Sequence, residues 1–181
     1  MKKQQSYKTA LCGVVSALSL VIMFLTGVIP VMSYTLPAIA GAILIAIVIE
    51  LNIKWALLSY MAVSLLAIFI TPDKESAFLF VAFLGYYPII KASIEKIHSR
   101  ILEWFVKLAI FNVVMFISYQ LLVYVFKMNE LIEQISNYNK YGIFILILAA
   151  NIVFVLYDIA MTGVISTYYN IVRPKINRYL K

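Results

Sequence analysis

Residues that bind metals or form disulfides are almost absent from this chain. There is one cysteine, Cys12, and one histidine, His98, in 181 residues. A single cysteine excludes an intrachain disulfide and a cysteine-based metal site. His98 closes the stretch Glu95-Lys96-Ile97-His98, and Glu-x-x-His alone offers too few ligands to hold a metal ion. The sequence therefore predicts no metal, no cofactor and, without a convergent set of acids or bases, no enzyme activity.

Charge is also scarce. Only 13% of the residues are charged and 64% are hydrophobic, whereas a soluble domain carries about a quarter charged residues. The short alternating strands of a transmembrane barrel are not visible in the sequence. We therefore expect an all-α, polytopic integral membrane protein.

Long apolar runs recur six times along the chain. A membrane-spanning helix needs roughly 20 apolar residues, and the runs qualify or nearly qualify. The second and third are separated only by a tight turn at Asn52. The fourth is short and is expected to end at Lys91. We expect one membrane domain over 1–181, with spans at about 9–28, 36–51, 55–70, 77–90, 102–126 and 141–167.

Basic residues predict the orientation of these spans. With a cytoplasmic N-terminus, twelve of the fifteen lysines and arginines fall on the inner side, and only Lys74, Lys127 and Lys140 lie outside. Positive residues gather on the cytoplasmic side of membrane proteins. We therefore expect both termini in the cytoplasm of a cell-membrane protein, and no nucleic-acid partner, because a basic soluble domain is missing.

The outer connections differ in character. The first contains Tyr34 between two prolines, Pro30 and Pro37, which favours an ordered, non-helical connection. In the second, Thr71 is expected to cap a helix whose first position is Pro72. That pattern leaves Lys74 without a structural role.

The third outer connection is predicted to contain a surface helix. Residues 128–136 place apolar side chains on one helical face and acidic and amide side chains on the other. Such a helix lies along a membrane surface. It could cover a cavity as a lid, or simply rest among the headgroups.

Polar and aromatic residues gather in the C-terminal half. Asn151 and Asp158 are seven residues apart in the last span, so they share one helical face. Polar groups inside a membrane face the bundle interior, a partner or a water-filled cavity. Seven residues are candidates for binding a substrate: Tyr34, Lys74, Tyr86, Asn112, Tyr119, Gln120 and Asn151.

Structural alternatives apply to several of these residues. Asn112 and Asn151 could hydrogen-bond between helices. Asp158 could pair with a basic residue of the inner side or contact a partner. Tyr86 lies in Gly85-Tyr86-Tyr87-Pro88, a pattern typical of an interrupted helix, and interrupted helices are found at transport sites.

The first span has a different character, with small residues in place of polar ones. Gly13 is followed four residues later by Ala17, and Ala10 by Val14. Small residues one turn apart let another helix approach closely. We therefore expect Ala10, Gly13, Val14 and Ala17 to dock a partner.

The layout resembles the S components of energy-coupling factor (ECF) transporters, the vitamin-binding subunits of bacterial uptake systems. The resemblance lies in the length, six spans, the basic N-terminus, Lys8-Thr9-Ala10-Leu11 through Ala17-Leu18, and Pro30…Tyr34…Pro37-Ala38…Gly41. It implies capture of a small water-soluble vitamin or related nutrient from outside. It also implies, as partners, a transmembrane coupling subunit and two ATP-hydrolysing subunits, which power toppling of the S component. The chain has no Gly-rich Lys-Ser/Thr loop of its own for ATP.

Two other classes of membrane protein have a similar size. A non-transporting scaffold, similar to a rod-shape-determining membrane protein, would bind partners through its helices and need no polar pocket. A small secondary transporter or channel should show inverted repeats, but the two halves differ in polarity and loop length. The polar face of the last span and the interrupted fourth span favour ligand binding over the scaffold.

Overall fold

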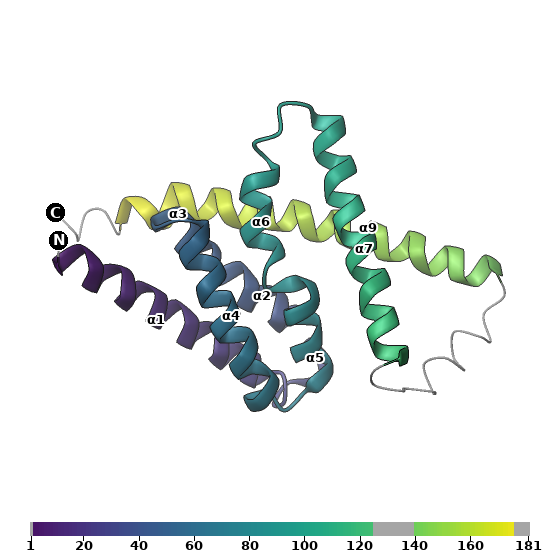
Figure 1. The fold of residues 1–181 in the computed structure, drawn as a ribbon, viewed down its shortest axis with the longest axis horizontal. Helices are drawn as coiled ribbons and strands as arrows, with labels where there is room; N and C mark the ends of the chain where they lie inside the picture. Colours follow the sequence, from purple (N-terminus) through teal and green to yellow (C-terminus); the bar gives the residue numbers. More distant parts are fainter. Residues whose placement is uncertain (1, 125–139, 176–181) are drawn as a thin grey trace. The chain divides into compact units, whose positions relative to one another are not determined.

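The described part of the chain is helical throughout. The structure is a computed structural model that describes residues 2–124 and 140–175. In these ranges helices and turns alternate, and no strand is present (Figure 1). The surface helix predicted at 128–136 lies outside the described residues.

The helices follow the predicted apolar runs, but their ends are shifted. Three runs are interrupted, at Leu44, at Phe80–Leu84 and at Tyr168–Val172. Their bounds are α1 (Lys2–Leu25), η1 (Pro30–Met32), α2 (Thr35–Ile43), α3 (Ile45–Glu50), α4 (Ile53–Ile70), α5 (Lys74–Leu79), η2 (Phe80–Leu84), α6 (Tyr87–Ile94), α7 (Arg100–Tyr124), α9 (Lys140–Thr167) and η3 (Tyr168–Val172).

Five described helical segments are long and apolar enough to cross a membrane. They are Gln5–Leu25, Ile53–Ile70, Lys74–Ile94, Arg100–Leu121 and Gly142–Lys175. At the second predicted span, 36–51, the helical stretch is Thr35–Glu50, which is shorter than these five and is divided into α2 and α3 at Leu44. These features are those of a membrane-embedded protein, and the sixth crossing stays a prediction.

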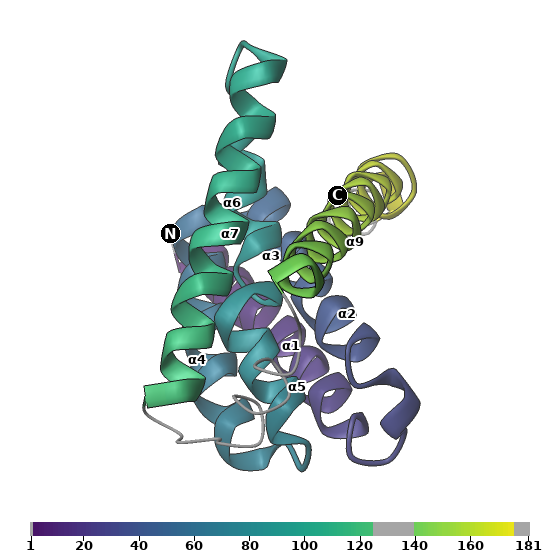
Figure 2. The same ribbon diagram turned by 90° about the vertical axis from the view of Figure 1, so that its right-hand side faces the viewer.

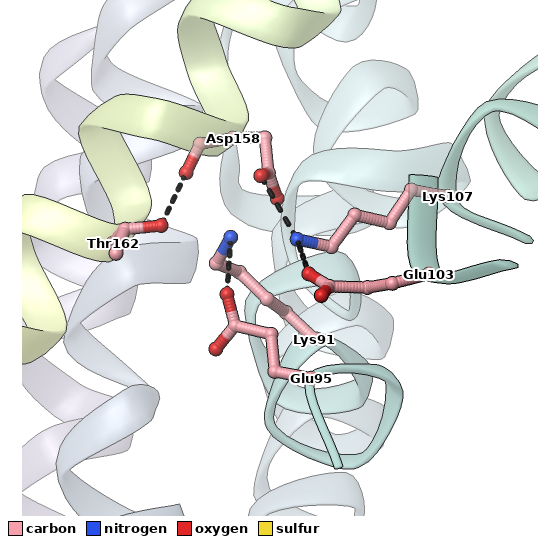
Figure 3. Close-up of polar contacts among 6 residues, drawn as sticks. All are labelled: Lys91, Glu95, Glu103, Lys107, Asp158 and Thr162. Atoms are coloured by element: carbon pink, nitrogen blue, oxygen red, sulfur yellow. Dashed lines mark hydrogen bonds and ion pairs between the residues drawn. The ribbon is translucent and has the colours of Figure 1, made fainter. Parts of the chain in front are cut away.

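Of two predicted helix boundaries, one is confirmed and one is wrong, each for a local reason. The Asn52 turn is confirmed, because its side chain caps α4 by accepting a hydrogen bond from the Trp55 N–H at 3.2 Å. The predicted end at Lys91 is wrong. The helix continues to Ile94, and Lys91 Nζ pairs with Glu95 Oε1 one turn on, at 2.8 Å (Figure 3). A buried ammonium with this partner does not have to end the helix at the interface.

The contacts divide the chain into two compact units, each described by itself. Unit 1 comprises 1–96 with 164–181, and unit 2 comprises 97–163. In unit 1, α1 packs along α2 and α4 (Figures 1 and 2). Its core includes Met23, Leu44, Val63 and Phe80, all fully buried.

Close backbone contact fixes the packing of α2 in unit 1. A Cβ atom at Gly41 would lie 2.0 Å from the Leu84 carbonyl oxygen of η2. Only glycine allows this approach. The short helix α2 is thereby held directly against the interrupted segment α5–η2–α6, which is where the candidate site of unit 1 lies.

Unit 2 is built from α7 and most of α9, which cross each other (Figures 1 and 2). At the crossing the Phe111 and Phe154 rings stack, with centroids 4.6 Å apart and planes 9° apart. Away from it, apolar side chains such as Phe105, Phe116 and Leu156 are exposed. Exposed apolar surface of this extent suits helices that face lipid.

Candidate functional site

The first two connections of unit 1 are fastened to each other. Tyr34 Oη donates a hydrogen bond to Glu75 Oε1 at 2.9 Å. Ser76 Oγ lies 2.7 Å from the Ser33 carbonyl oxygen, and Pro72 Cγ lies 2.5 Å from the position of a Cβ at Gly27. The first connection is thus ordered by contacts between residues 41–45 positions apart. The prediction that it is non-helical is wrong, because η1 occupies Pro30–Met32 and α2 begins at Thr35.

Asp73 begins helix α5, so the predicted capping by Thr71 is wrong. The Asp73 carboxylate accepts hydrogen bonds from the Glu75 and Ser76 N–H groups at 3.1 and 3.3 Å and from the Ser76 hydroxyl. Burial acts to raise the pKa of Asp73, but hydrogen bonds from Ser76, Ser33 and the backbone outweigh it and lower the pKa. Asp73, not Thr71, is therefore the N-cap, and Pro72 lies outside the helix instead of at its first position.

Lys74, left without a structural role by the sequence, closes the end of α4. Its Nζ donates to the Ile68 carbonyl at 2.8 Å and to the Thr71 carbonyl at 3.0 Å. A helix ends with unpaired carbonyls and a partial negative charge, and a lysine stabilises both. In this structure the ammonium group serves helix α4.

Tyr34 carries a raised pKa for the same local reason. Its hydroxyl donates to the Glu75 carboxylate, and this bond, the Glu75 charge, burial and the Asp73 charge all raise the pKa of Tyr34. The ring itself is 64% exposed. Tyr34 therefore ties the two connections together at the surface, where a solute can reach it.

The fourth span is interrupted, as the sequence predicted. Residues Phe80–Leu84 form a π-helical stretch, with the Gly85 N–H bonded to the Phe80 carbonyl at 2.8 Å. Pro88, near the start of α6, has no N–H to donate to the carbonyl four residues back. Tyr60 of α4 donates its hydroxyl to the Val81 carbonyl at 2.6 Å, a hydrogen bond from another helix to the π-helical backbone. We call this region, residues 80–88, the helix break.

Aromatic rings surround the helix break. Tyr60 lies 6.0 Å from Phe80 and 5.9 Å from Tyr86 between ring centroids. Phe83 stacks on Tyr87 at 4.7 Å and meets Tyr86 edge-on at 6.0 Å. Tyr60 and Tyr86 are only partly buried. Tyr86, predicted from sequence, thus belongs to a real ring cluster.

Two buried hydroxyls near the helix break and the outer connections make no hydrogen bond of standard geometry. They are Ser64 Oγ and Thr71 Oγ1. The Ser64 hydroxyl is nevertheless close enough to the Tyr60 hydroxyl to interact with it, so Thr71 is the clearer case of a buried group without a partner, which costs about 1–3 kcal/mol. Sequence analysis missed Ser64 and Tyr60, although their spacing of four residues places them on one face of α4.

In unit 2 the two predicted asparagines pair with each other. Asn112 Nδ2 donates to Asn151 Oδ1 at 2.8 Å, and Asn151 Nδ2 donates to Asn112 Oδ1 at 3.2 Å. Each amide also donates to a carbonyl of its own helix, that of Leu108 or Ile147, at 2.8 Å. The alternative of interhelical hydrogen bonding is confirmed, and both donors of each amide are in use.

Asp158 forms an ion pair with a basic residue, which is one of the alternatives that the sequence predicted. Lys107 Nζ lies 3.0 Å from Asp158 Oδ2 and 2.7 Å from Glu103 Oε1 (Figure 3). The side chains of Lys107 and Asp158 are 2% and 3% exposed. Thr162 donates to the Asp158 carbonyl at 3.1 Å. We call Glu103, Lys107 and Asp158 the charged cluster of unit 2.

The remaining predicted substrate residues, Tyr119 and Gln120, lie near the end of the described part of α7. Tyr119 is 40% exposed and Gln120 is partly buried. Of the seven candidates, Tyr34, Lys74 and Tyr86 belong to unit 1, and the other four belong to unit 2. Within the described residues, no three histidine, cysteine or acidic side chains gather to hold a metal ion.

The predicted docking residues share the outward face of α1. Ala10, Gly13, Val14 and Ala17 are exposed, and a Cβ at Gly13 would meet no atom within 4 Å. The opposite face, with Val15, Ser19 and Met23, is buried in unit 1. A shallow hollow of about 590 Å³ continues the outward face toward the N-terminus, lined by Gln5, Ser6, Thr9 and Ala10.

No protein-family model matches this chain, and neither a curated protein nor a solved structure matches it.

Proposed function

We propose that the chain is the substrate-binding S component of an ECF transporter. In this role it captures a small water-soluble vitamin or related nutrient from outside the cell and delivers it to an ATP-driven uptake complex. Its partners are a transmembrane coupling subunit and two ATP-hydrolysing subunits. It crosses the cell membrane six times, with both termini in the cytoplasm, and catalyses no reaction itself.

The helix break of unit 1 is the observation that carries the proposal. Irregular backbone at membrane depth is tolerated only where protein or water satisfies it, and broken helices form the binding sites of many transporters. At about 1.5 Å per residue, Tyr60 lies roughly 15 Å from the end of α4 at Ile70. The Tyr60–Val81 hydrogen bond and the ring cluster thus lie near the middle of the span. A scaffold has no evident need for such a region.

The proposed orientation and the sixth crossing rest on the sequence pattern. Twelve of fifteen basic residues lie on the inner side in this arrangement. The pair α2–α3, covering Thr35–Glu50, then crosses as a short span, which a bilayer accommodates by thinning locally. Both fastened connections of unit 1 fall on the outer face, beside the route of an incoming solute.

The outward face of α1 supports the proposed assembly. Ala10, Gly13 and Ala17 offer little side-chain bulk, so a partner helix can approach the backbone. The exposed face of α4 carries Leu58, Leu65 and Phe69 instead, which suits lipid. The coupling subunit is therefore proposed to dock on α1.

One observation favours the alternative, a non-transporting membrane scaffold. The amides of Asn112 and Asn151 and the charged cluster of unit 2 are matched within the protein. These polar groups hold helices together without a ligand. In the scaffold reading, the outward face of α1 serves partner binding alone.

A thermal-shift screen of the detergent-purified chain against water-soluble vitamins and their precursors tests the proposal. A ligand that binds only the folded state stabilises it by about 2.7 kcal/mol at a hundred times its dissociation constant. We expect one ligand class to raise the melting temperature. If protein shown to be monodisperse and helical gives no shift with any compound, the scaffold is the better reading.

A pair of tryptophan variants tests docking. Ala17→Trp should leave ligand binding unchanged but abolish uptake, because the indole blocks close approach to α1. Leu65→Trp, on the exposed face of α4, is the matched control and should retain uptake. Normal uptake by Ala17→Trp would contradict docking on this face.

A further inference from the structure

Three elements of unit 1 meet around one carboxylate. Glu50 ends α3, and its side chain is 8% exposed. The Tyr168 hydroxyl of η3 donates to Glu50 Oε1 at 3.5 Å, and Arg173 Nε lies 3.9 Å from the same oxygen. Tyr7, near the start of α1, lies close enough to Glu50 for its charge to act on the phenol. Glu50 thus joins the start of α1, the end of α3 and the segment after α9 at one end of unit 1 (Figure 1).

Positive charge at this end of unit 1 exceeds negative charge. Four basic residues lie next to the residues just described or within four positions of them in the chain: Lys8, Lys54, Arg173 and Lys175. Lys54 and Lys175 are exposed and Lys8 is half-buried. None of these three lysines has a hydrogen bond or an ion pair with a residue that the structure describes. Four positive charges against that of Glu50 leave a net charge of +3. We call these five residues the basic end of unit 1.

The basic end lies where membrane-spanning segments start and stop. Of the segments long and apolar enough to cross a membrane, one starts at Gln5, another starts at Ile53 and a third ends at Lys175. The ends of such segments lie at the depth of the lipid headgroups, and long basic side chains extend toward that level. Anionic headgroups attract basic residues beside the membrane surface. The nearest counter-charge for the three lysines is therefore a lipid phosphate.

Arg173 is held in a position that suits a phosphate. Its Cζ lies 4.5 Å from the centroid of the Tyr169 ring, its Nε faces Glu50, and its side chain is 34% exposed. The guanidinium presents five N–H donors in a planar fork that matches phosphate oxygens. Within the described residues its two Nη groups have no acceptor. The stacked ring and the carboxylate restrict the guanidinium beforehand, so that less rotamer freedom is lost when a phosphate binds.

We propose that the basic end of unit 1 binds the headgroup of an anionic phospholipid. Arg173 is the directional contact to the phosphate, and Lys8, Lys54 and Lys175 supply further positive charge. This inference goes beyond the proposed function, because the surface takes no part in nutrient capture and would serve a transporter subunit and a scaffold alike. Zwitterionic phospholipids are not expected to bind there, because they bring no net negative charge.

A lipid titration of the full chain, purified in a nonionic detergent, tests this proposal. Phosphatidylglycerol is added in mixed micelles, and phosphatidylcholine with the same acyl chains serves as the control. We expect a saturable rise in melting temperature with phosphatidylglycerol and little change with phosphatidylcholine. Inorganic phosphate at the same concentration distinguishes a lipid from a free anion and should give no shift. Equal shifts with the two lipids, or a shift with inorganic phosphate, would overturn the proposal.

Three charge-removing variants locate the site. Lys54→Gln should weaken phosphatidylglycerol binding about 5-fold, the effect of roughly one basic residue near an anionic membrane surface, and Arg173→Gln at least as much. Arg100→Gln is the matched control, because it removes the same charge from an exposed position at the start of α7 in unit 2. It should bind phosphatidylglycerol as the wild type does.

The variants distinguish a site from general attraction to a basic surface. Equal weakening in all three, or unchanged affinity in Lys54→Gln and Arg173→Gln, would contradict the basic end as the binding site. Arg173→Gln also removes an ion pair of the folded chain. If that variant does not fold, Lys54→Gln decides the question, because its side chain has no partner among the described residues.

Discussion

Unit 1 brings backbone close to backbone, whereas unit 2 joins two crossing helices through polar side chains. In unit 1, Gly41 lies against the Leu84 carbonyl. In unit 2, the Asn112–Asn151 amides and the Lys107–Asp158 ion pair bridge α7 and α9, and a Cβ at Gly163 would meet nothing within 4 Å. Lipid supplies no hydrophobic driving force between helices, so association depends on close packing or on hydrogen bonds. Each unit relies mainly on one of these two.

The two units should therefore be sensitive to different kinds of substitution. In unit 1 an added methyl group at Gly41 would meet the Leu84 carbonyl oxygen, and backbone atoms cannot move aside. Unit 2 tolerates changes of volume but not the removal of one member of a polar pair. Unit 1 also has polar contacts, at the helix break and between its first two connections, but these join side chains to backbone or lie at the surface.

The largest effect is expected from the charged cluster of unit 2. Lys107→Met leaves Asp158 and Glu103 without their shared ammonium, and breaking a buried pair costs about 3–5 kcal/mol. The free energy of unfolding in mild detergent should fall by that amount. The double variant Lys107→Met/Asp158→Leu should recover much of the loss, because an apolar pair of similar volume needs no charge partner. Equal loss in the double and single variants would contradict this account.

Gly41→Ala should be the most damaging small change in unit 1. The added methyl group would overlap the Leu84 carbonyl, and overpacking costs about 1–3 kcal/mol. Gly13→Ala, on the open face of α1, is the matched control and should be neutral or stabilising by up to about 1 kcal/mol, since alanine favours helix. Thermal unfolding of the two variants side by side measures the contrast. Similar melting temperatures would remove the distinction between the two glycines.

The asparagine pair should contribute less. Changing Asn112 and Asn151 to leucine singly and together forms a double-mutant cycle, and hydrogen bonds between membrane helices contribute about 0.6–2 kcal/mol. The coupling free energy should fall in that range. Because Asn151 is also a predicted substrate residue, Asn151→Leu should abolish ligand binding, and titration of the ligand identified by thermal shift decides that point. A coupling of zero would mean that the amides do not hold α7 against α9.

The smallest effect concerns the cap of α5 and its pH dependence. Because the folded pKa of Asp73 lies below its ordinary 3.8, its stabilisation is present above pH 3.8 and is lost as the pH falls through the folded value. Asp73→Ala should lower stability at pH 7 by about 0.5–2 kcal/mol, the usual range for a lost cap. The difference from wild type should shrink toward pH 3. A difference independent of pH would show that the carboxylate charge is not involved.

Much of the helical layout could be predicted from the sequence. Apolar runs located the helices, Asn52 marked the turn before α4, and Gly85 with Pro88 marked the interruption of the fourth span. These signals are local, because helix caps, proline and hydrophobic runs act within a few residues. The choice of Asp73 over Thr71 as the cap was missed, since both residue types cap helices.

The candidate site was harder to predict. Tyr60 and Ser64 looked like ordinary residues of an apolar span, and nothing near them in sequence indicated the Val81 carbonyl 21 residues away. For Lys74, which stays a predicted substrate residue, the carbonyl partners at the end of α4 could not be found from sequence either, because they depend on how the chain turns back. Partners distant in sequence follow from packing, not from local pattern.

The sequence by itself determined that the chain is helical and membrane-embedded. Its apolar composition and the length of its apolar runs decide this, because such runs are stable in lipid only as helices. Only the tertiary structure decided how its polar groups are used. It paired Asn112 with Asn151 and Lys107 with Asp158, and it directed the Tyr60 hydroxyl to the Val81 carbonyl, because a buried hydrogen bond depends on the position of both groups in space. The same residue types could have bound a ligand or held two helices together, and only their positions in the folded chain distinguish these two roles.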